Sequence, residues 1–194
     1  MKKIIFLAAA LVISAAAFSQ TSFGLKSGLS LANLTNSEGE AKFKPSIYAG
    51  GFMEFSLNYI ISVSPELYYS RQGFHAEEDD VKMNLRLNYM NLPVLVKLYV
   101  ADNLSLDLGP QVGFLLNSKV WVKSGGVSAT MDVPNEYMPV ELNSVDVSFA
   151  MGLTYNLGNF FLQGRYNLGL TDIAKDDPDH SKNSVIQFGV GYRF

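Results

Sequence analysis

The sequence contains no cysteine, and few of its residues are charged. Without cysteine the chain forms no disulfide bond, offers no thiolate to a metal ion, and carries no lipid-modified cysteine behind a signal peptide. Charged residues make up 17% of the chain, against about 25% in ordinary soluble domains. The formal net charge of -3 is not the basic footprint of a nucleic-acid-binding protein, so we expect no nucleic-acid partner.

A long apolar run is also missing beyond the first residues. No later stretch reaches the ~18 consecutive apolar residues that indicate a membrane-spanning helix. At the start, Lys2 and Lys3 precede a short apolar run from Ile4 to Ile13, and small residues stand before Gln20. This pattern predicts a secretory signal peptide at residues 1–19, since an N-terminal membrane anchor would need a longer run. Residues 20–194 then have the length of one domain.

What the sequence does have is alternation of apolar residues with small or polar ones. This period of two indicates β-strands. Eight segments show it: 21–33, 47–57, 60–73, 84–100, 104–117, 144–156, 160–170 and 185–194. The connections between them alternate in length. Short ones fall near Asn58, Asp102 and Gly158, and long ones span roughly 34–45, 74–83, 123–143 and 172–183. We therefore predict an up-and-down antiparallel meander with both termini on the short-turn side.

One segment, 84–100, breaks the alternation. Leu87 and Tyr89 share one parity, whereas Leu92 and Val94 share the other. A one-residue shift moves every side chain of a strand to the opposite face. We therefore predict a β-bulge around residues 90–91, a place where the following Pro93 is tolerated.

The composition of the two faces distinguishes two kinds of closed barrel. A soluble barrel buries its apolar face and shows a charged face to water, whereas a membrane barrel reverses this arrangement. Here the less apolar face consists mostly of Gly, Ser, Asn, Gln and Thr, and charge gathers in the long connections, as in HAEEDDVK and AKDDPDH. We predict an all-β fold, an eight-stranded antiparallel up-and-down transmembrane β-barrel formed by residues 20–194, with membrane lipid as its surroundings.

The last strand, VIQFGVGYRF, supports the membrane assignment. Its lipid-facing positions are predicted to be Ile186, Phe188, Val190, Tyr192 and Phe194, and Arg193 is predicted to face the lumen. Alternate apolar residues that end in a terminal Phe resemble the signal read by the outer-membrane barrel-assembly machinery. We expect Phe188, Val190, Tyr192 and Phe194 to form this C-terminal assembly signal and to bring the machinery in as a partner during biogenesis.

Several motifs carry a family resemblance. In order along the chain, FGLKSGLSLANL, SPELYYSRQGF, LNYMNLPVLVKLYV, LGPQVGFLLNSK, QGRYNLGLTDI and FGVGYRF resemble the PorT-like outer-membrane β-barrel family, small porin-family barrels of Gram-negative bacteria. The resemblance spans nearly the whole chain after the signal peptide. It implies an eight-stranded barrel in the cell outer membrane and, for some members, a link to protein secretion. The chain departs from the family pattern at Asn91, where the resemblance implies an acidic residue.

Charged residues on the lumen-facing parity form the candidate site. They are Lys26, Glu54, Glu66, Lys97, Asp107, Asp146, Arg165 and Arg193, four of each sign. Intramembrane ionisable groups can mark function, but a barrel of eight strands holds little besides its own side chains. A paired structural plug, a narrow ion path and a specific site are the three interpretations. A symmetric hairpin about Asp102 predicts a Lys97–Asp107 pair, with Glu66 as a second partner of Lys97.

Signals for catalysis, metals and cofactors are weak. The two histidines, His75 and His180, fall in long connections and match no triad spacing. The acidic runs 77–80 and 176–179 do not follow the spaced calcium-loop pattern. We therefore expect no catalytic residue, no metal and no cofactor. The predicted role is a non-enzymatic outer-membrane scaffold or interaction protein whose extracellular loops contact a partner. An accessory role in secretion is one form that this function could take. The alternatives are a narrow porin-like channel for small solutes and, third, a rim-active enzyme.

Overall fold

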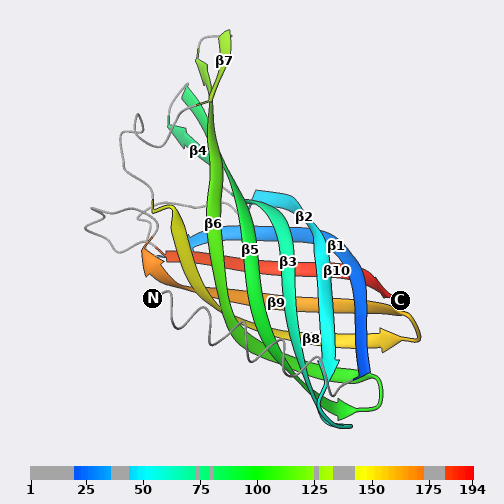
Figure 1. Ribbon diagram of the computed structural model, residues 1–194. Coiled ribbons are helices and arrows are strands. Elements are labelled where there is room, and N and C mark those ends of the chain that lie inside the picture. Colours follow the sequence, from blue (N-terminus) through cyan, green and yellow to red (C-terminus); the bar gives the residue numbers. More distant parts are fainter. Residues whose placement is uncertain are drawn as a thin grey trace.

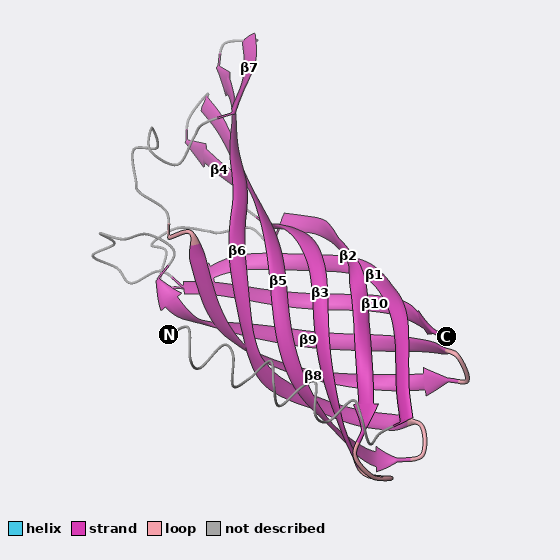
Figure 2. Ribbon diagram, viewed as in Figure 1, coloured by secondary structure: helices cyan, strands magenta, loops and turns pink. Residues whose placement is uncertain are grey.

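The computed structural model of the chain describes residues 20–35, 44–72, 75–78, 81–124, 127–132, 143–172 and 182–194. The predicted signal peptide at 1–19 lies outside these residues and remains a prediction. Figure 2 shows that the described chain consists of strands joined by turns. The strands are β1 (Gln20–Thr35), β2 (Lys44–Ser56), β3 (Ile61–Gln72), β4 (His75–Glu78), β5 (Val81–Ala101), β6 (Leu104–Ser124), β7 (Val127–Asp132), β8 (Val145–Leu157), β9 (Phe160–Asp172) and β10 (Lys182–Arg193).

The strands form one sheet that closes on itself. Its order is β4-β5-β3-β2-β1-β10-β9-β8-β6-β7, and an additional β5–β6 pairing joins the two sides. Every pairing is antiparallel. The closed part holds eight strands of the described chain, and β4 and β7 flank the ends of β5 and β6 that project beyond it (Figure 1). The predicted eight-stranded antiparallel barrel is confirmed.

The two short strands correct part of the prediction. β4 and β7 lie within segments 74–83 and 123–143, which the sequence suggested were long connections without strands. Both form because β5 and β6 continue past the barrel and offer further backbone partners: β4 pairs with residues 81–84 of β5, and β7 pairs with residues 119–124 of β6. We call β4, β7 and the paired residues 81–88 and 117–124 the β-extension.

Short turns occupy the opposite end of the barrel. Asn58 Oδ1 accepts hydrogen bonds from the backbone N–H groups of Ile60 and Ile61, both at 2.8 Å, and so closes the β2–β3 turn. The β8–β9 turn has only two residues between its paired strand ends, and Gly158 takes a left-handed φ of 65° there. Phe194 donates its backbone N–H to the Phe23 carbonyl at 2.9 Å, which places the chain end beside β1 at this same end.

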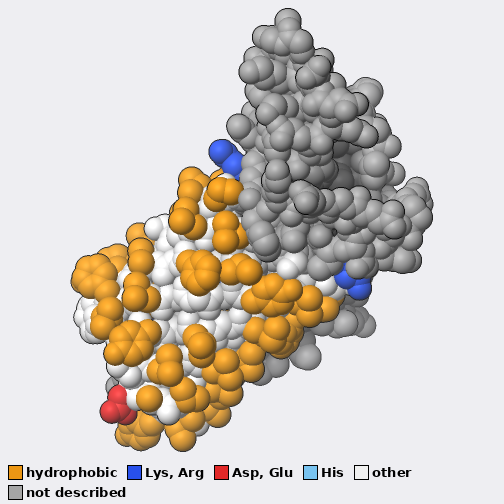
Figure 3. All heavy atoms as spheres, turned by 180° about the vertical axis from the view of Figure 1, so that it is seen from behind, with side chains coloured by type: hydrophobic (Ala, Val, Ile, Leu, Met, Phe, Trp, Pro, Cys, Tyr) orange, Lys and Arg blue, Asp and Glu red, His pale blue; other side chains and the backbone are white. Residues whose placement is uncertain are grey.

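The outer wall is apolar and the interior is polar. Along β8 the exposed residues Phe149, Met151 and Leu153 alternate with buried Ser148, Ala150 and Gly152, and the other barrel strands follow the same rule. In Figure 3 hydrophobic side chains spread over the described wall, and charged ones lie toward its ends. This is the polarity of a transmembrane barrel, in which lipid surrounds the wall and closure pairs the backbone groups. In the described part of the chain, no helix is long and apolar enough to cross a membrane.

β5 contradicts the predicted bulge. Leu87, Tyr89 and Asn91 are all buried, and the same parity continues inward to Lys97, so no residue is inserted at 90–91. The irregularity lies on β6: Asn88 pairs with Asn117 and Tyr89 with Leu115, which leaves Leu116 as the extra residue. Apolar residues change parity along β5 because the two faces exchange polarity where the strand leaves the apolar wall. The sequence pattern of such an exchange is the same as that of an inserted residue.

Candidate functional site

A cluster of three charged residues, one carboxylate and two cations, crosses the middle of the barrel. Arg165 donates from Nη1 to Glu66 Oε2 and from Nη2 to Glu66 Oε1, both at 2.8 Å. Lys26 donates from Nζ to Glu66 Oε2 at 2.6 Å. All three residues are buried. Glu66 on β3 and Arg165 on β9 are separated by three strands in either direction around the barrel, so this two-pronged contact joins opposite walls.

Amide and hydroxyl groups extend the ion pair toward β6. Lys26 Nζ donates to Gln163 Oε1 at 3.1 Å, and Gln163 Nε2 donates to Asp107 Oδ2 at 3.1 Å. Asp107 also accepts from Thr154 Oγ1 at 2.6 Å and from Ser105 Oγ at 2.8 Å. The Asp107 carboxylate therefore has three hydrogen-bond donors besides any cation, which supports a buried charge well.

A second cluster lies nearer the short-turn end. Lys97 Nζ lies 3.5 Å from Glu54 Oε2 and 4.0 Å from Asp107 Oδ2. Glu54 Oε2 also accepts from Arg193 Nη2 at 3.0 Å, and Glu54 Oε1 accepts from the Tyr99 hydroxyl. Through Asp107 and Lys97 the two clusters form one chain of contacts from mid-barrel to the short-turn mouth.

The predicted hairpin register is confirmed, but the second partner of Lys97 is not. Lys97 and Asp107 are direct cross-strand partners. Glu66, by contrast, contacts Lys26 and Arg165, and Glu54 is the second carboxylate beside Lys97. The prediction relied on Lys97 and Glu66 lying on paired strands. In the structure Lys97 pairs with Ser62, and Glu66 lies four residues further along β3, where it contacts Arg165 of the opposite wall.

Asp146 stands apart from the other predicted charges. It is buried on β8 toward the β-extension and accepts from Thr171 Oγ1 at 3.1 Å. Among the described residues, no lysine or arginine forms an ion pair with it. Two buried atoms near this level, Ser148 Oγ and Asn167 Oδ1, have no hydrogen-bond partner in the described structure. Buried polar atoms without a protein partner are usually hydrated, which points to water in this half of the lumen.

Neutral groups form a further layer above the ion pairs. The Tyr68 hydroxyl donates to Gln111 Oε1 at 2.7 Å, and Gln187 Nε2 donates to the Tyr68 hydroxyl at 3.4 Å. Asn91, where the family resemblance implies an acid, donates from Nδ2 to Ser70 Oγ at 2.9 Å and accepts from Gln111 at 3.3 Å. The position thus belongs to a neutral amide network rather than a charge pair.

The sequence reasoning missed several aromatic rings that fill the lumen. Tyr48, Phe52 and Phe161 are buried, and Phe52 and Phe161 pack edge-to-face with centroids 5.4 Å apart. Lys26 Nζ lies 5.3 Å from the Tyr68 ring centroid and 5.9 Å from that of Tyr48. Some glycines on the lumen-facing parity were the available sequence signal, because a larger side chain there would collide with a ring. A Cβ on Gly191, for example, would lie 2.1 Å from Phe161 Cζ. Gly191 is thus an inward glycine that leaves room for a ring from another strand.

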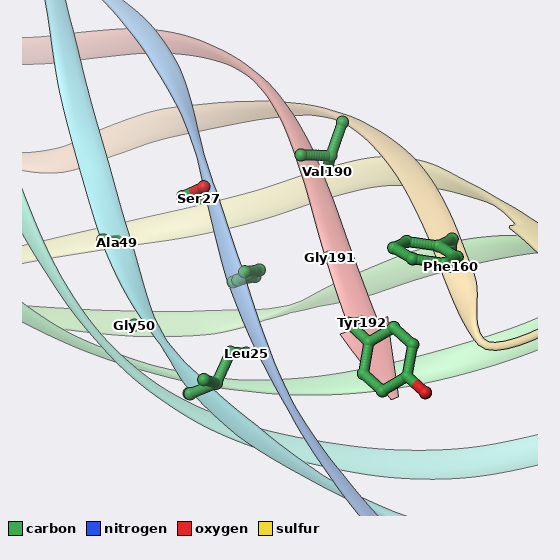
Figure 4. Close-up of a pocket in the computed structure, with 10 residues that line it drawn as sticks. Leu25, Ser27, Ala49, Gly50, Phe160, Val190, Gly191 and Tyr192 are labelled. Carbon is green, nitrogen blue, oxygen red and sulfur yellow. The ribbon is translucent and has the colours of Figure 1, made fainter. Parts of the chain in front are cut away.

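The outer wall carries a shallow groove of about 680 Å³. Leu25, Phe160, Val190 and Tyr192 form its sides, and small residues of β1, β2 and β10 form its floor (Figure 4). These four side chains are exposed on the apolar wall. The groove therefore opens on the membrane-facing wall, and the lumen residue Lys26 also contributes to its lining.

The proposed assembly signal lies on the same wall. Phe188, Val190, Tyr192 and Phe194 are all exposed. The Phe194 ring packs on Phe23 at 5.4 Å and on Tyr192 at 5.2 Å between centroids. These residues form an aromatic cluster where β10 meets β1, while recognition by the assembly machinery remains a prediction.

Candidate catalytic and metal positions are not assembled by the described residues. His75 lies on β4, and His180 lies outside the described residues. Glu77 and Glu78 lie on β4, whereas 79–80 and 176–179 are outside the described part. Within the described chain, no three His, Cys, Asp or Glu residues are grouped to hold a metal ion.

Comparison with known proteins agrees with this architecture. A family model described as an outer membrane protein beta-barrel domain matches residues 18–175. The attachment invasion locus protein Ail of Yersinia pestis is 16% identical, with a TM-score of 0.55, and the match covers 90% of this chain and 99% of Ail. Neisserial surface protein A is 12% identical, with a TM-score of 0.57 and coverage of 90% and 99%. No curated protein sequence matched the chain.

Proposed function

The chain belongs to the outer membrane protein beta-barrel family and lies in the outer membrane, and from this premise we propose that it is a non-conducting membrane scaffold that works through its extracellular β-extension. Barrels of this kind place short turns in the periplasm and longer connections outside the cell. The turns at 57–60, 102–103 and 158–159 and the chain end Phe194 therefore mark the periplasmic end. The β-extension projects from the other end (Figure 1).

The cross-barrel contact between Arg165 and Glu66 is the observation that carries the proposal. It joins opposite walls at 2.8 Å, and Lys26 and Gln163 bind alongside it. The rings of Tyr48, Phe52, Tyr68 and Phe161 occupy the adjoining space. An ion that passed through the lumen would have to separate Arg165 from Glu66. The interior of an eight-stranded barrel is only wide enough for its own side chains, so there is little room beside this contact.

The β-extension supplies the second line of support. Four strands, β4-β5-β6-β7, continue beyond the barrel as a paired sheet. A barrel that served only to anchor itself would not need such a projection. A surface held together by strand pairing is suited to contacts with other molecules, because it loses less conformational entropy on binding than an unpaired loop does. Ail, a similar fold, is named for attachment and invasion.

Within this role, we infer that the chain is a PorT-like member of the family and that its protein partner belongs to a secretion apparatus. The ordered motifs from FGLKSGLSLANL to FGVGYRF support this finer assignment. We also infer that it is not an enzyme, because its polar groups are used in lumen contacts and His75 stands on an edge strand.

A narrow channel is the second candidate, and one observation favours it. Ser148 Oγ and Asn167 Oδ1 are buried without partners in the described structure, and buried polar atoms of this kind are usually hydrated, which favours a wet extracellular half of the lumen. Conduction would then require that the Arg165–Glu66 layer opens and that the neighbouring rings and polar side chains move aside.

Planar-bilayer recording tests the proposal. We expect the wild-type protein to show no steady conductance, and the double variant Arg165→Ala with Glu66→Ala to conduct, because it removes the contact between opposite walls. Arg165→Lys, which keeps a cation beside Glu66, is the matched control and should stay closed. A stable wild-type conductance would make the channel the better conclusion.

A further inference from the structure

Asp146 differs from the other buried carboxylates of the described lumen. The others each lie within 4.0 Å of a lysine or arginine nitrogen, and they are Glu54, Glu66 and Asp107. Among the described residues, Asp146 has only neutral partners: Thr171 Oγ1 donates to it at 3.1 Å, and the Asn183 side chain hydrogen-bonds to it. Burying a carboxylate costs free energy that neutral donors offset in part and that a nearby cation offsets further.

The side chains of Asp146 and Asn91 face each other across Gly113. On β6, Gly113 is the cross-strand partner of both residues, Asn91 on β5 and Asp146 on β8. A Cβ placed on Gly113 would lie 2.9 Å from Asn91 Oδ1 and 3.6 Å from Asp146 Cβ. Because Asn91 donates from Nδ2 to Ser70 Oγ at 2.9 Å, its amide oxygen is the atom turned toward Gly113. Two acceptors, a carboxylate and an amide oxygen, thus flank one glycine.

Ser148 adds a third oxygen on the same side of the lumen. It follows Asp146 by two residues on β8, so both side chains point inward, about 7 Å apart along the strand. Ser148 is only 3% exposed, and its Oγ has no hydrogen-bond partner in the described structure. A buried hydroxyl without a protein partner marks a place where an ion or a water molecule binds.

We propose that Asp146, Asn91 and Ser148 bind a hard metal cation such as Ca²⁺ in the half of the lumen toward the β-extension. Hard cations take oxygen ligands from carboxylates, amide carbonyls and water, and a hydroxyl oxygen belongs to the same class. The three side chains supply part of the coordination shell, and water completes it. Water alone can donate to both facing acceptors, but only a cation also balances the buried charge of Asp146.

A cation at this position ties β5 to β8. The two strands do not pair with each other, because β6 lies between them. Asn91 and Gly113 precede the β-extension by a few residues on β5 and β6, so the bound ion braces its base. Sequence patterns did not indicate the site, because Asp146 is its only charged ligand. The inference goes beyond the proposed scaffold role, and it depends neither on a closed lumen nor on the partner of the β-extension.

The test uses the full-length barrel in nanodiscs of phosphatidylcholine, a lipid without net charge, with Tb³⁺ as a luminescent substitute for Ca²⁺. Tyrosine excitation should produce Tb³⁺ emission, because Tyr89 Cδ1 lies 3.5 Å from the same Cβ position on Gly113. Added Ca²⁺ should compete this emission away. Asp146→Asn should abolish the competed signal, and Tyr89→Phe should lower the emission while calorimetry still detects Ca²⁺ binding.

Matched variants separate this site from the other carboxylates of the chain. Asn91→Asp adds a second carboxylate across Gly113, so it should tighten the apparent affinity for Ca²⁺ by about tenfold, because affinity follows the number of charged ligands. Asp102→Asn and Asn103→Asp make the same two changes in the exposed β5–β6 turn at the other end of the barrel. Both controls should bind Ca²⁺ as the wild type does.

Three results would overturn the proposal. A wild-type barrel without a competed signal would mean that Asp146 is only hydrated or neutral. An Asp146→Asn signal equal to that of the wild type would place the ion on other carboxylates. An Asn91→Asp affinity equal to that of the wild type would do the same, and this result counts even if Asp146→Asn does not refold. Bilayer conductance, which tests the proposed function, is independent of these outcomes.

Discussion

Arg165 and Glu66 join opposite walls of the barrel through two parallel hydrogen bonds of 2.8 Å, and Lys26 shares the same carboxylate at 2.6 Å. One carboxylate thus balances two cations that are buried in the lumen. Because buried charges are costly unless they are paired, the three residues depend on one another.

Replacing Glu66 by Gln should therefore destabilise the barrel strongly. The change leaves Lys26 and Arg165 buried without a counter-charge, and we expect a loss of about 3–5 kcal/mol in the free energy of unfolding. Urea unfolding in lipid vesicles measures it. Asp102→Asn, in the exposed β5–β6 turn, is the matched control and should change little. A loss for Glu66→Gln no larger than that of the control would show that the lumen solvates the two cations.

Lys97 should couple energetically to both of its carboxylate neighbours. It lies 3.5 Å from Glu54 and 4.0 Å from Asp107, and each carboxylate keeps other donors when Lys97 is replaced. Double-mutant cycles of Lys97→Met with Asp107→Leu, and with Glu54→Leu, should give coupling energies of about 0.5–3 kcal/mol. Urea unfolding again supplies the values. Coupling of Lys97 to Glu66 instead, tested by the same cycle, would contradict the arrangement of the walls.

The contrast between these two clusters shows which contacts can be predicted from the sequence. Lys97 and Asp107 flank a tight turn, so the period of two and a symmetric hairpin were enough to predict their register. Glu66 and Arg165 are 99 residues apart and lie on strands that never pair. Their meeting depends on the stagger of the strands around the closed barrel, which local patterns do not encode.

β5 shows a different limit. Its apolar residues change parity between Tyr89 and Leu92, and a bulge was the simpler interpretation. The strand instead crosses from the membrane into water, where the two faces exchange polarity, and Leu116 on β6 is the extra residue. A single-strand pattern cannot tell these cases apart, because the location of the extra residue is a property of the pair.

Inward glycines should not tolerate a methyl group where a neighbouring strand lies close. A Cβ on Gly50 would lie 2.2 Å from the Leu67 carbonyl oxygen and 2.4 Å from Tyr68 Cα, both of them backbone atoms. Gly50→Ala should cost about 1–3 kcal/mol in the free energy of unfolding. Gly164→Ala is the control, because its Cβ would meet only the Phe188 ring at 3.8 Å. Equal stabilities in urea would mean that β2 and β3 can separate without cost.

The C-terminal residue should matter more for biogenesis than its neighbour. Phe194 is exposed on the lipid-facing wall and packs on Phe23 and Tyr192, whereas Arg193 Nη2 donates to Glu54 at 3.0 Å inside the mouth. We expect Phe194→Asp, or deletion of Phe194, to lower the amount of protein in the outer membrane far more than Arg193→Gln. The aspartate places a charge among exposed rings at the membrane boundary, and the deletion removes the last residue of the proposed assembly signal. Immunoblots of outer-membrane fractions measure the amount, and urea unfolding of the refolded variants separates assembly from stability. If Phe194→Asp assembles normally, or if both changes lower the amount equally, then the assembly machinery does not read the exposed face of β10.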